Sequence, residues 1–421
     1  MKGRFTLLLC SLALAGAVSC SQGEAASEAS RLLRTVPSRS VEVMCFRNGG
    51  KALAMLLDSS SVFRRIELGR LSDHEIVLSY DYSSTLVPLL GIDAGRSAGD
   101  TSEAAKGVIA QLGGLGLHHS YVVDTVQKRA ALLVSPSTAA ISEALTHIAS
   151  GASILDAPDF GEAVREAGGG EGYVIVRNSA AAHLLPADFL KGKVDRKALS
   201  SFLSGACEWT VINFQSYRTQ NIRLRPCGIS DKRWFLSVPA QMKGSSSKLS
   251  GILPASADFV VDLPLSDWKA WYSARCEWLD ARSVLARHKR SCDALKSSAG
   301  LAPADWAASL NPEEIALVCW EGRKALLIRT RARLSGGLED NRFAGFPAAV
   351  FGSVFSLDDE SSCCSHGGWL LIGGKDDIAA LAVAEEHASP DVLREKGLAY
   401  AVVAPGFSVA GLPAEASLNI Q

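Results

Sequence analysis

Two short clusters combine residue types that can bind a metal ion or move a proton. The first, Cys363-Cys364-Ser365-His366, holds two potential thiolates and an imidazole. Adjacent cysteines lack the loop that normally lets two thiolates reach one tetrahedral ion, and no second group of Cys or His lies nearby in the sequence. The second is His118-His119, which we interpret as a loop leading into a strand over residues 120–123. We therefore predict no metal site and no cofactor.

The chain also lacks the common catalytic motifs. It contains no Gly-x-Ser-x-Gly nucleophile elbow and no His-Glu-x-x-His zinc motif. The glycine pairs before Lys51 and Lys375 lack the upstream glycine of a phosphate-binding loop, and they suit turns between a strand and a helix. We assign no catalytic residue and expect a protein without enzymatic activity.

Four cysteines raise the question of disulfides. Cys207 and Cys227 flank a predicted hairpin almost symmetrically about Tyr217, so their side chains could meet across two antiparallel strands. They are our candidate disulfide. Cys276 and Cys292 lie sixteen residues apart in one predicted helix, which would separate them by about 24 Å. This second pair could bond only if the helix breaks. Cys45 and Cys319 fall in predicted buried strands, where we expect apolar packing.

The elements that carry these residues alternate between strands and helices. Residues 313–329 form a predicted hairpin around the polar turn 321–324, and a predicted helix runs from about 266 to 295. Strands over 208–215, 221–225 and 233–238 would form a β-meander. Antiparallel hairpins mixed with helices predict an α+β fold, with a mixed or antiparallel sheet packed against helices.

Four segments of the first half recur in the same order in the second half. The offsets are 217, 239, 238 and 227 residues, for 41–46 with 258–263, 71–78 with 310–317, 131–134 with 369–372, and 173–176 with 400–403. Ordered matches at compatible offsets predict an internal duplication. We place the first unit at 36–243, a Gly/Ser-rich linker at 244–250, and the second unit at 251–421. The β-meander is expected in the first unit only.

Composition narrows the class of protein. The chain has 421 residues, of which 43 are Lys or Arg and 44 are Asp or Glu. The resulting net charge of -1 gives no electrostatic basis for binding nucleic acid. With 48% hydrophobic and 21% charged residues, the chain is too apolar for a disordered protein, and its length suits two domains.

The N-terminus has the pattern of an export signal. Lys2 and Arg4 precede an apolar stretch over residues 5–18, which is too short for a comfortable transmembrane helix. The residues that follow, 17–20, read Ala-Val-Ser-Cys and resemble the bacterial lipobox, which implies a signal peptide over 1–20 and a lipid on Cys20. The alternative is a secretory signal cut after a small residue such as Ala17. Ser21 favours the outer membrane, and we interpret 21–35 as a tether.

The whole arrangement is similar to a broad group of bacterial lipoproteins and exported proteins of unknown function. The residues that carry this resemblance are 253–258, Leu-Pro-Ala-Ser-Ala-Asp, and 150–155, Ser-Gly-Ala-Ser-Ile-Leu, before Pro158-Asp159-Phe160. The resemblance covers most of residues 36–410. It implies a lipid anchor in the cell envelope, facing the periplasm or the cell surface, and it brings no activity with it.

Three functions remain open on these grounds. The first is a non-enzymatic, membrane-anchored protein that binds or assembles an envelope protein partner. The aromatic helix over 268–278 could offer it a binding face, or could be core. The second is a carrier or sensor of a lipid or another apolar ligand, which requires an apolar pocket of roughly 300 Å³ or more. The third is an enzyme whose residues converge only in space.

Overall fold

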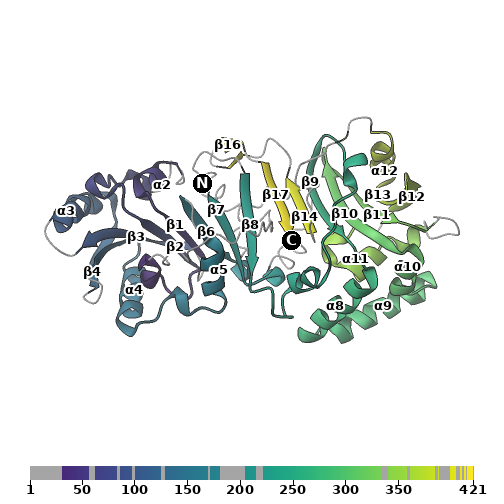
Figure 1. The fold of residues 1–421 in the computed structure, drawn as a ribbon, viewed down its shortest axis with the longest axis horizontal. Coiled ribbons are helices and arrows are strands. Elements are labelled where there is room, and N and C mark those ends of the chain that lie inside the picture. The colour runs from purple at the N-terminus through teal and green to yellow at the C-terminus, as the bar shows by residue number, and fades with distance from the viewer. Residues whose placement is uncertain are drawn as a thin grey trace.

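The computed structural model describes residues 31–420, with gaps at 56–61, 83–85, 97–99, 125–128, 169–170, 181–203, 215–220, 333–339, 358–360, 385–386, 388–398, 404–407, 410–411 and 414. The fold is α+β, as the sequence predicts. The described strands include one sheet of 15 strands, with helices packed against it (Figure 1). Among the described residues, the strand pairings in this sheet are antiparallel, except that of β17 (Glu415–Ile420) with β8 (Asn221–Cys227), which is parallel.

The first half of the chain supplies the strands at one end of this sheet. Its other strands are β1 (Glu42–Phe46), β2 (Ile76–Tyr82), β3 (Leu86–Arg96), β4 (His118–Asp124), β5 (Arg129–Ser135), β6 (Gly172–Arg177) and β7 (Trp209–Phe214). Its helices are α2 (Gly49–Met55), α3 (Asp100–Leu112), α4 (Thr138–Ser150) and α5 (Phe160–Ala167). The Ser137 side chain caps the first turn of helix α4.

The second half supplies the other end of the sheet. Its strands include β9 (Ala257–Pro264), β10 (Pro312–Trp320), β11 (Arg323–Thr330), β12 (Ser362–His366), β13 (Trp369–Gly373) and β14 (Ala399–Val403), and a separate small ladder joins β15 (Ser408–Val409) to β16 (Leu412–Pro413). Its helices are α8 (Trp268–Ala281), α9 (Leu285–Ala299), α10 (Pro303–Leu310), α11 (Phe346–Phe351) and α12 (Lys375–Ala382). The predicted hairpin is β10–β11, and its turn at Glu321-Gly322 has two positive φ angles, as a tight hairpin turn requires.

The two halves arrange their strands in the same order. From the outer edge inward, the first half runs β4-β5-β3-β2-β1-β6-β7, and the second runs β12-β13-β11-β10-β9-β14-β17. Strand β8 lies between β7 and β17 and joins the two ends into one sheet (Figure 1). The pairings also agree in register: Phe46 lies opposite Ile76 in the first half, and Leu263 lies opposite Ile315 in the second.

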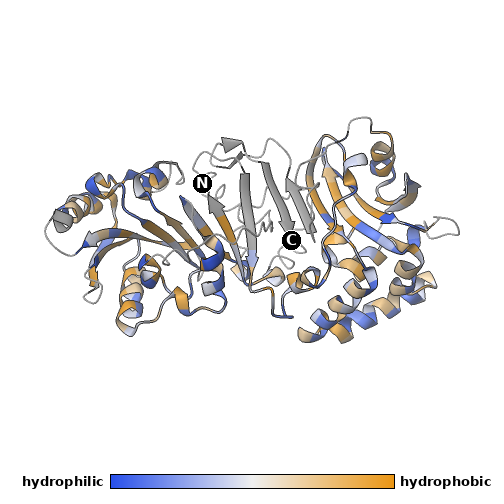
Figure 2. Cartoon of the chain, in the orientation of Figure 1, coloured by the Kyte–Doolittle hydropathy of each residue, from blue (hydrophilic) through white to orange (hydrophobic). Residues whose placement is uncertain are grey.

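Apolar side chains bury both faces of the sheet. The largest cluster packs one face against α3 in the first half, and against α8, α10 and α11 in the second. On the opposite face, α5 and α4 cover the first half, and α12 covers part of the second. Figure 2 accordingly shows hydrophobic colouring along strands β10 and β11, and mixed colouring on the surface helices α8 and α9. Cys45 and Cys319 are buried in strands, which confirms the packing role predicted for them.

Three local predictions are wrong. The helix predicted over 266–295 is broken into α8 and α9 at Ser283, which has a φ of 58°. Residues 233–238 form no third strand of a meander, because Phe235–Ser237 is a short 3-10 helix. The strands of the meander were expected in the first unit only, but the second half has a counterpart: β17 pairs with β14 as β7 pairs with β6.

The segment predicted as a linker packs against the second half. The Ser247 hydroxyl and the Lys248 backbone amide both donate to the Glu314 carboxylate, at 2.9 Å, and Leu249 is fully buried. The unit boundaries themselves stay a prediction.

Candidate functional site

The residues singled out by sequence lie in different parts of the molecule. Cys20, the predicted lipid attachment site, lies outside the described residues. Cys207 and Cys227 are both fully buried, and no disulfide joins them in the structure. The Cys207 thiol instead forms hydrogen bonds inside the core: the Asn178 amide donates to its Sγ at 2.8 Å, and the thiol donates to the Trp209 carbonyl at 3.2 Å. Burial raises the pKa of the Cys207 thiol to about 12.

The aromatic helix does not offer its tryptophans to a partner. Trp271 is fully buried and Trp268 nearly so, because both pack into the core under the sheet. Trp278 is partly buried: its ring meets Phe235 edge-on at 5.3 Å, and its Nε1 donates to the Arg233 carbonyl at 3.1 Å. Core packing is therefore the main role of these tryptophans, and the helix does not present them as a binding face.

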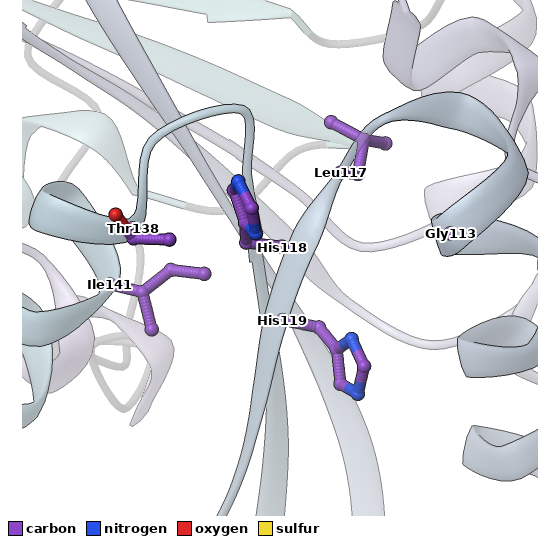
Figure 3. Close-up of a pocket in the computed structure, with 6 residues that line it drawn as sticks. All are labelled: Gly113, Leu117, His118, His119, Thr138 and Ile141. Atoms are coloured by element: carbon purple, nitrogen blue, oxygen red, sulfur yellow. The ribbon is translucent and has the colours of Figure 1, made fainter.

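A pocket of about 370 Å³ lies at the start of strand β4. It is lined by Gly113, Leu117, His118, His119, Thr138 and Ile141. Strand β4 begins at His118, so the two histidines belong to the strand itself and not to a loop before it. Figure 3 shows the His118 side chain directed toward α4, where Thr138 and Ile141 lie, and the His119 side chain on the opposite side of the strand. The alternation of side chains along a strand produces this arrangement.

The pocket borders an open edge of the sheet. All seven residues of β4 pair with β5 on one side, and β4 is the last strand at this end of the sheet among the described residues. Its sequence, His-His-Ser-Tyr-Val-Val-Asp, contains neither Lys nor Pro, which commonly protect edge strands from pairing. Val123 is 42% exposed on this strand. The arrangement can accept another extended chain, with backbone hydrogen bonds along β4 and a side chain in the pocket.

The opposite edge, strand β12, is less available. It has five residues, and the backbone amide of Cys363 already donates to the Asn341 side chain at 3.0 Å. The two ends of the sheet therefore differ in their capacity to pair.

A second group of reactive side chains was missed by the sequence analysis. The break between α8 and α9 brings Tyr272, Arg275 and Cys276 of α8 close to His288 and Cys292 of α9. The break has a weak sequence signal, because Ser283 is neither Gly nor Pro. The sequence indicated this group only indirectly: Cys276 and Cys292 could meet only if the predicted helix was broken between them.

Three almost completely buried carboxylic acids with raised pKa values lie outside both of these groups. Asp262 and Glu314 are neighbours on β9 and β10, and both are almost completely buried. Burial, followed by the charge of Glu314, raises the pKa of Asp262 well above its usual range; burial also raises the pKa of Glu314. Glu42, on β1, is fully buried, and burial raises its pKa to about 8.

Within the described part of the chain, no group of three or more His, Cys, Asp or Glu side chains is placed to hold a metal ion. No described helix has the length and apolarity needed to cross a bilayer. Comparison with models of protein families, with curated proteins and with solved structures found no match to this chain.

Proposed function

We propose that this chain is a membrane-anchored, non-enzymatic binding protein of the bacterial cell envelope. Its occupant is an extended segment of a partner protein, which pairs with the edge strand β4. The observation that carries this proposal is the open, seven-residue edge of β4 with a pocket at its start. The anchor rests on the N-terminal sequence: the apolar stretch over residues 5–18 is followed by Ser19 and then Cys20.

The composition of β4 favours an edge that a partner covers. An unprotected edge strand presents a row of backbone donors and acceptors, and folded proteins usually block it with Lys, Pro or a covering loop. Here Val122 and Val123 extend the strand with β-branched residues. Val122 packs toward α4, whereas Val123 is 42% exposed. A strand added along β4 would cover Val123 and satisfy the outer backbone groups at the same time.

The pocket provides selectivity for such a partner. Leu117 and Ile141 are mostly buried and form its apolar part, whereas the exposed histidines and Thr138 supply polar groups. In strand addition the backbone bonds supply affinity, and the pockets for alternate side chains supply specificity. A medium-sized side chain with a hydrogen-bonding end matches this lining better than a lipid tail, which needs an apolar cavity.

Site-specific crosslinking tests the binding edge. A photoreactive amino acid replaces Val123 in the anchored, full-length chain, and the control replaces Val383, which is 76% exposed at the end of α12. We expect a discrete protein adduct from position 123 and none of that size from position 383. Val123→Lys should reduce co-purification of the crosslinked protein at least tenfold, whereas Val383→Lys should leave it unchanged. Equal adducts from both positions would contradict binding along β4.

The anchor requires a separate measurement. Mass spectrometry of the mature N-terminus should find Cys20 as the first residue, with its added lipid. Cys20→Ser should release the chain from the membrane fraction. An unmodified N-terminus at another residue would refute the anchor and leave the β4 test unaffected.

We also infer that the two halves descend from one duplicated unit. The identical strand order supports this, and so does the register: Cys45 lies opposite Tyr173, and Asp262 lies opposite Tyr400, in agreement with the offsets of 217 and 227 found in the sequence. An experimental structure should superpose β1–β6 on β9–β14 with every strand in this register. A shift of one residue in any strand would reverse its faces and count against the inference.

A further inference from the structure

The break between α8 and α9 places two cysteines at the same level of a helical hairpin. Helix α8 ends at Ala281, Ser283 turns the chain with a φ of 58°, and α9 starts at Leu285 (Figure 1). Cys276 precedes Val284 by eight residues, and Cys292 follows it by eight. Antiparallel helices in contact lie about 8 to 10 Å apart at their axes, so facing positions can come within the range of a disulfide.

The side chains show that these two positions lie close together. Arg275, the residue before Cys276, lies 3.5 Å from His288, which is one turn before Cys292. Tyr272 lowers the pKa of both thiols, and the charge of Cys276 raises the pKa of Cys292, so all three side chains belong to one group. Both cysteines are partly exposed, so a reagent can reach them from solvent.

A histidine lies beside one of the thiols. The His288 Nε2 atom is 3.5 Å from the Cys292 Sγ and 3.5 Å from a terminal nitrogen of Arg275. Because a guanidinium group can only donate, the Nε2 atom presents a lone pair to the Cys292 thiol. Burial, followed by the charge of Arg275, lowers the pKa of His288 to about 4, so the ring is neutral at neutral pH and can accept a hydrogen bond from the Cys292 thiol.

Arg275 is fixed in place. It is 5% exposed, and the same terminal nitrogen donates to the Ala349 carbonyl on α11 at 2.6 Å. Its charge lowers the pKa of both thiols, but burial outweighs this effect and raises them overall. Both thiols are therefore protonated at neutral pH, and a disulfide between them places no charge in this half-buried position.

We propose that Cys276 and Cys292 form a reversible disulfide that ties α9 to α8. The oxidant is a disulfide of another thiol compound or thiol protein, written here as R–S–S–R. Cys292 gives its proton to the solvent, and its sulfur attacks one sulfur of R–S–S–R; that S–S bond breaks, and one R–S⁻ leaves and is protonated. Cys276 then loses its proton, and its sulfur attacks the Cys292 sulfur and expels the second R–S⁻, which is protonated in turn. The protein loses two electrons and two protons, and R–S–S–R gains them as two thiols.

The other cysteines in the described residues lack this combination of features. Cys45, Cys207, Cys227 and Cys319 are buried, which keeps them away from an oxidant. Cys363 and Cys364 are consecutive residues of strand β12, and their side chains point to opposite faces of the sheet. Among the described cysteines, Cys276 and Cys292 are therefore the pair that lies close together and can be reached by an oxidant.

Peptide mapping of the full-length protein tests the proposal. The purified chain is incubated with oxidised glutathione over a range of glutathione ratios, quenched by alkylation and digested with trypsin. We expect a linked species of Cys276–Arg282 with Ser291–Lys296, two hydrogens lighter than the separate peptides, and its disappearance on reduction. Cys276→Ser and Cys292→Ser should each abolish it, whereas Cys363→Ser should leave it intact. Recovery of both peptides only as alkylated or glutathione-bound monomers, at every ratio, would overturn the proposal.

Discussion

At the scale of single residues, the most unusual side chain is Glu42. It lies on β1 between Tyr80 of β2 and Val176 of β6, and it is completely buried. Neither of its carboxylate oxygens has a hydrogen-bond partner in the described structure. Burial without a partner disfavours the charged form, which raises the pKa of Glu42 to about 8. The carboxyl group is therefore mostly protonated at neutral pH.

This burial predicts a pH-dependent stability. The folded state holds a proton on Glu42 up to about pH 8, whereas an unfolded glutamate loses it near pH 4.5. The free energy of unfolding should therefore fall as the pH rises from about 4.5 to 8. Glu42→Gln removes this dependence and should be more stable than the wild type at pH 8 by roughly 3 to 5 kcal/mol, with a much smaller difference at pH 5. Urea unfolding at the two pH values measures the effect, and an equal difference at both would contradict it.

The sequence could predict some of these residues and not others. The buried strand positions of Cys45 and Cys319 followed from the apolar runs around them. Glu42 did not follow, because Val41-Glu42-Val43 reads as an alternating strand with its acid toward solvent. Strand β1 instead pairs with β2 and β6 on its two edges, and apolar side chains pack on both of its faces. This burial depends on segments that lie far from Glu42 in the sequence.

At the scale of elements, local signals predicted turns well and helix breaks poorly. The β10–β11 turn contains Gly322, which takes a positive φ without steric cost. The break between α8 and α9 uses Ser283 in the same region of φ, and no Gly or Pro marks it. The reactive thiol pair was missed for this reason. The pocket residues were noticed as His118-His119, but only the sheet shows that they start an edge strand.

The strained position of Ser283 provides an element-scale prediction. Ser283→Gly should stabilise the protein by about 1 kcal/mol, because glycine adopts a positive φ without the clash of a Cβ atom. The same change at Ser291, an exposed position within α9, should destabilise it by roughly 0.5 kcal/mol through lost helix propensity. Thermal unfolding of the two variants compares them. Destabilisation by Ser283→Gly would show that the turn does not carry this strain.

At the scale of the whole molecule, one sheet and one large apolar cluster connect the two halves. Phe235 follows β8 in the first half, and its ring meets Trp271 and Trp278 of α8 at 5.9 and 5.3 Å. The repeated strand order could be anticipated from sequence offsets, since each matched segment contains residues of a strand. The continuous sheet could not, because it depends on β8 pairing with β17 almost two hundred residues away.

This connection predicts that the halves unfold together. Phe235→Ala should destabilise the protein by about 3 kcal/mol or more and still give a single transition, because the cavity lies within a shared core. Val383→Ala, at an exposed site, should change stability by less than about 0.5 kcal/mol. Calorimetry distinguishes the outcomes. Two separate transitions, with only one of them moved by Phe235→Ala, would show that the halves unfold independently.

The proposed function depends on β4 being paired with a partner in the envelope. Amide hydrogen exchange measures this most directly, in the full-length chain in isolated envelopes and in the same chain after purification. We expect residues 118–124 of β4 to exchange at least tenfold more slowly in the envelope, and β12 to exchange equally in both preparations. Equal exchange of β4 in the two preparations would contradict the proposed function.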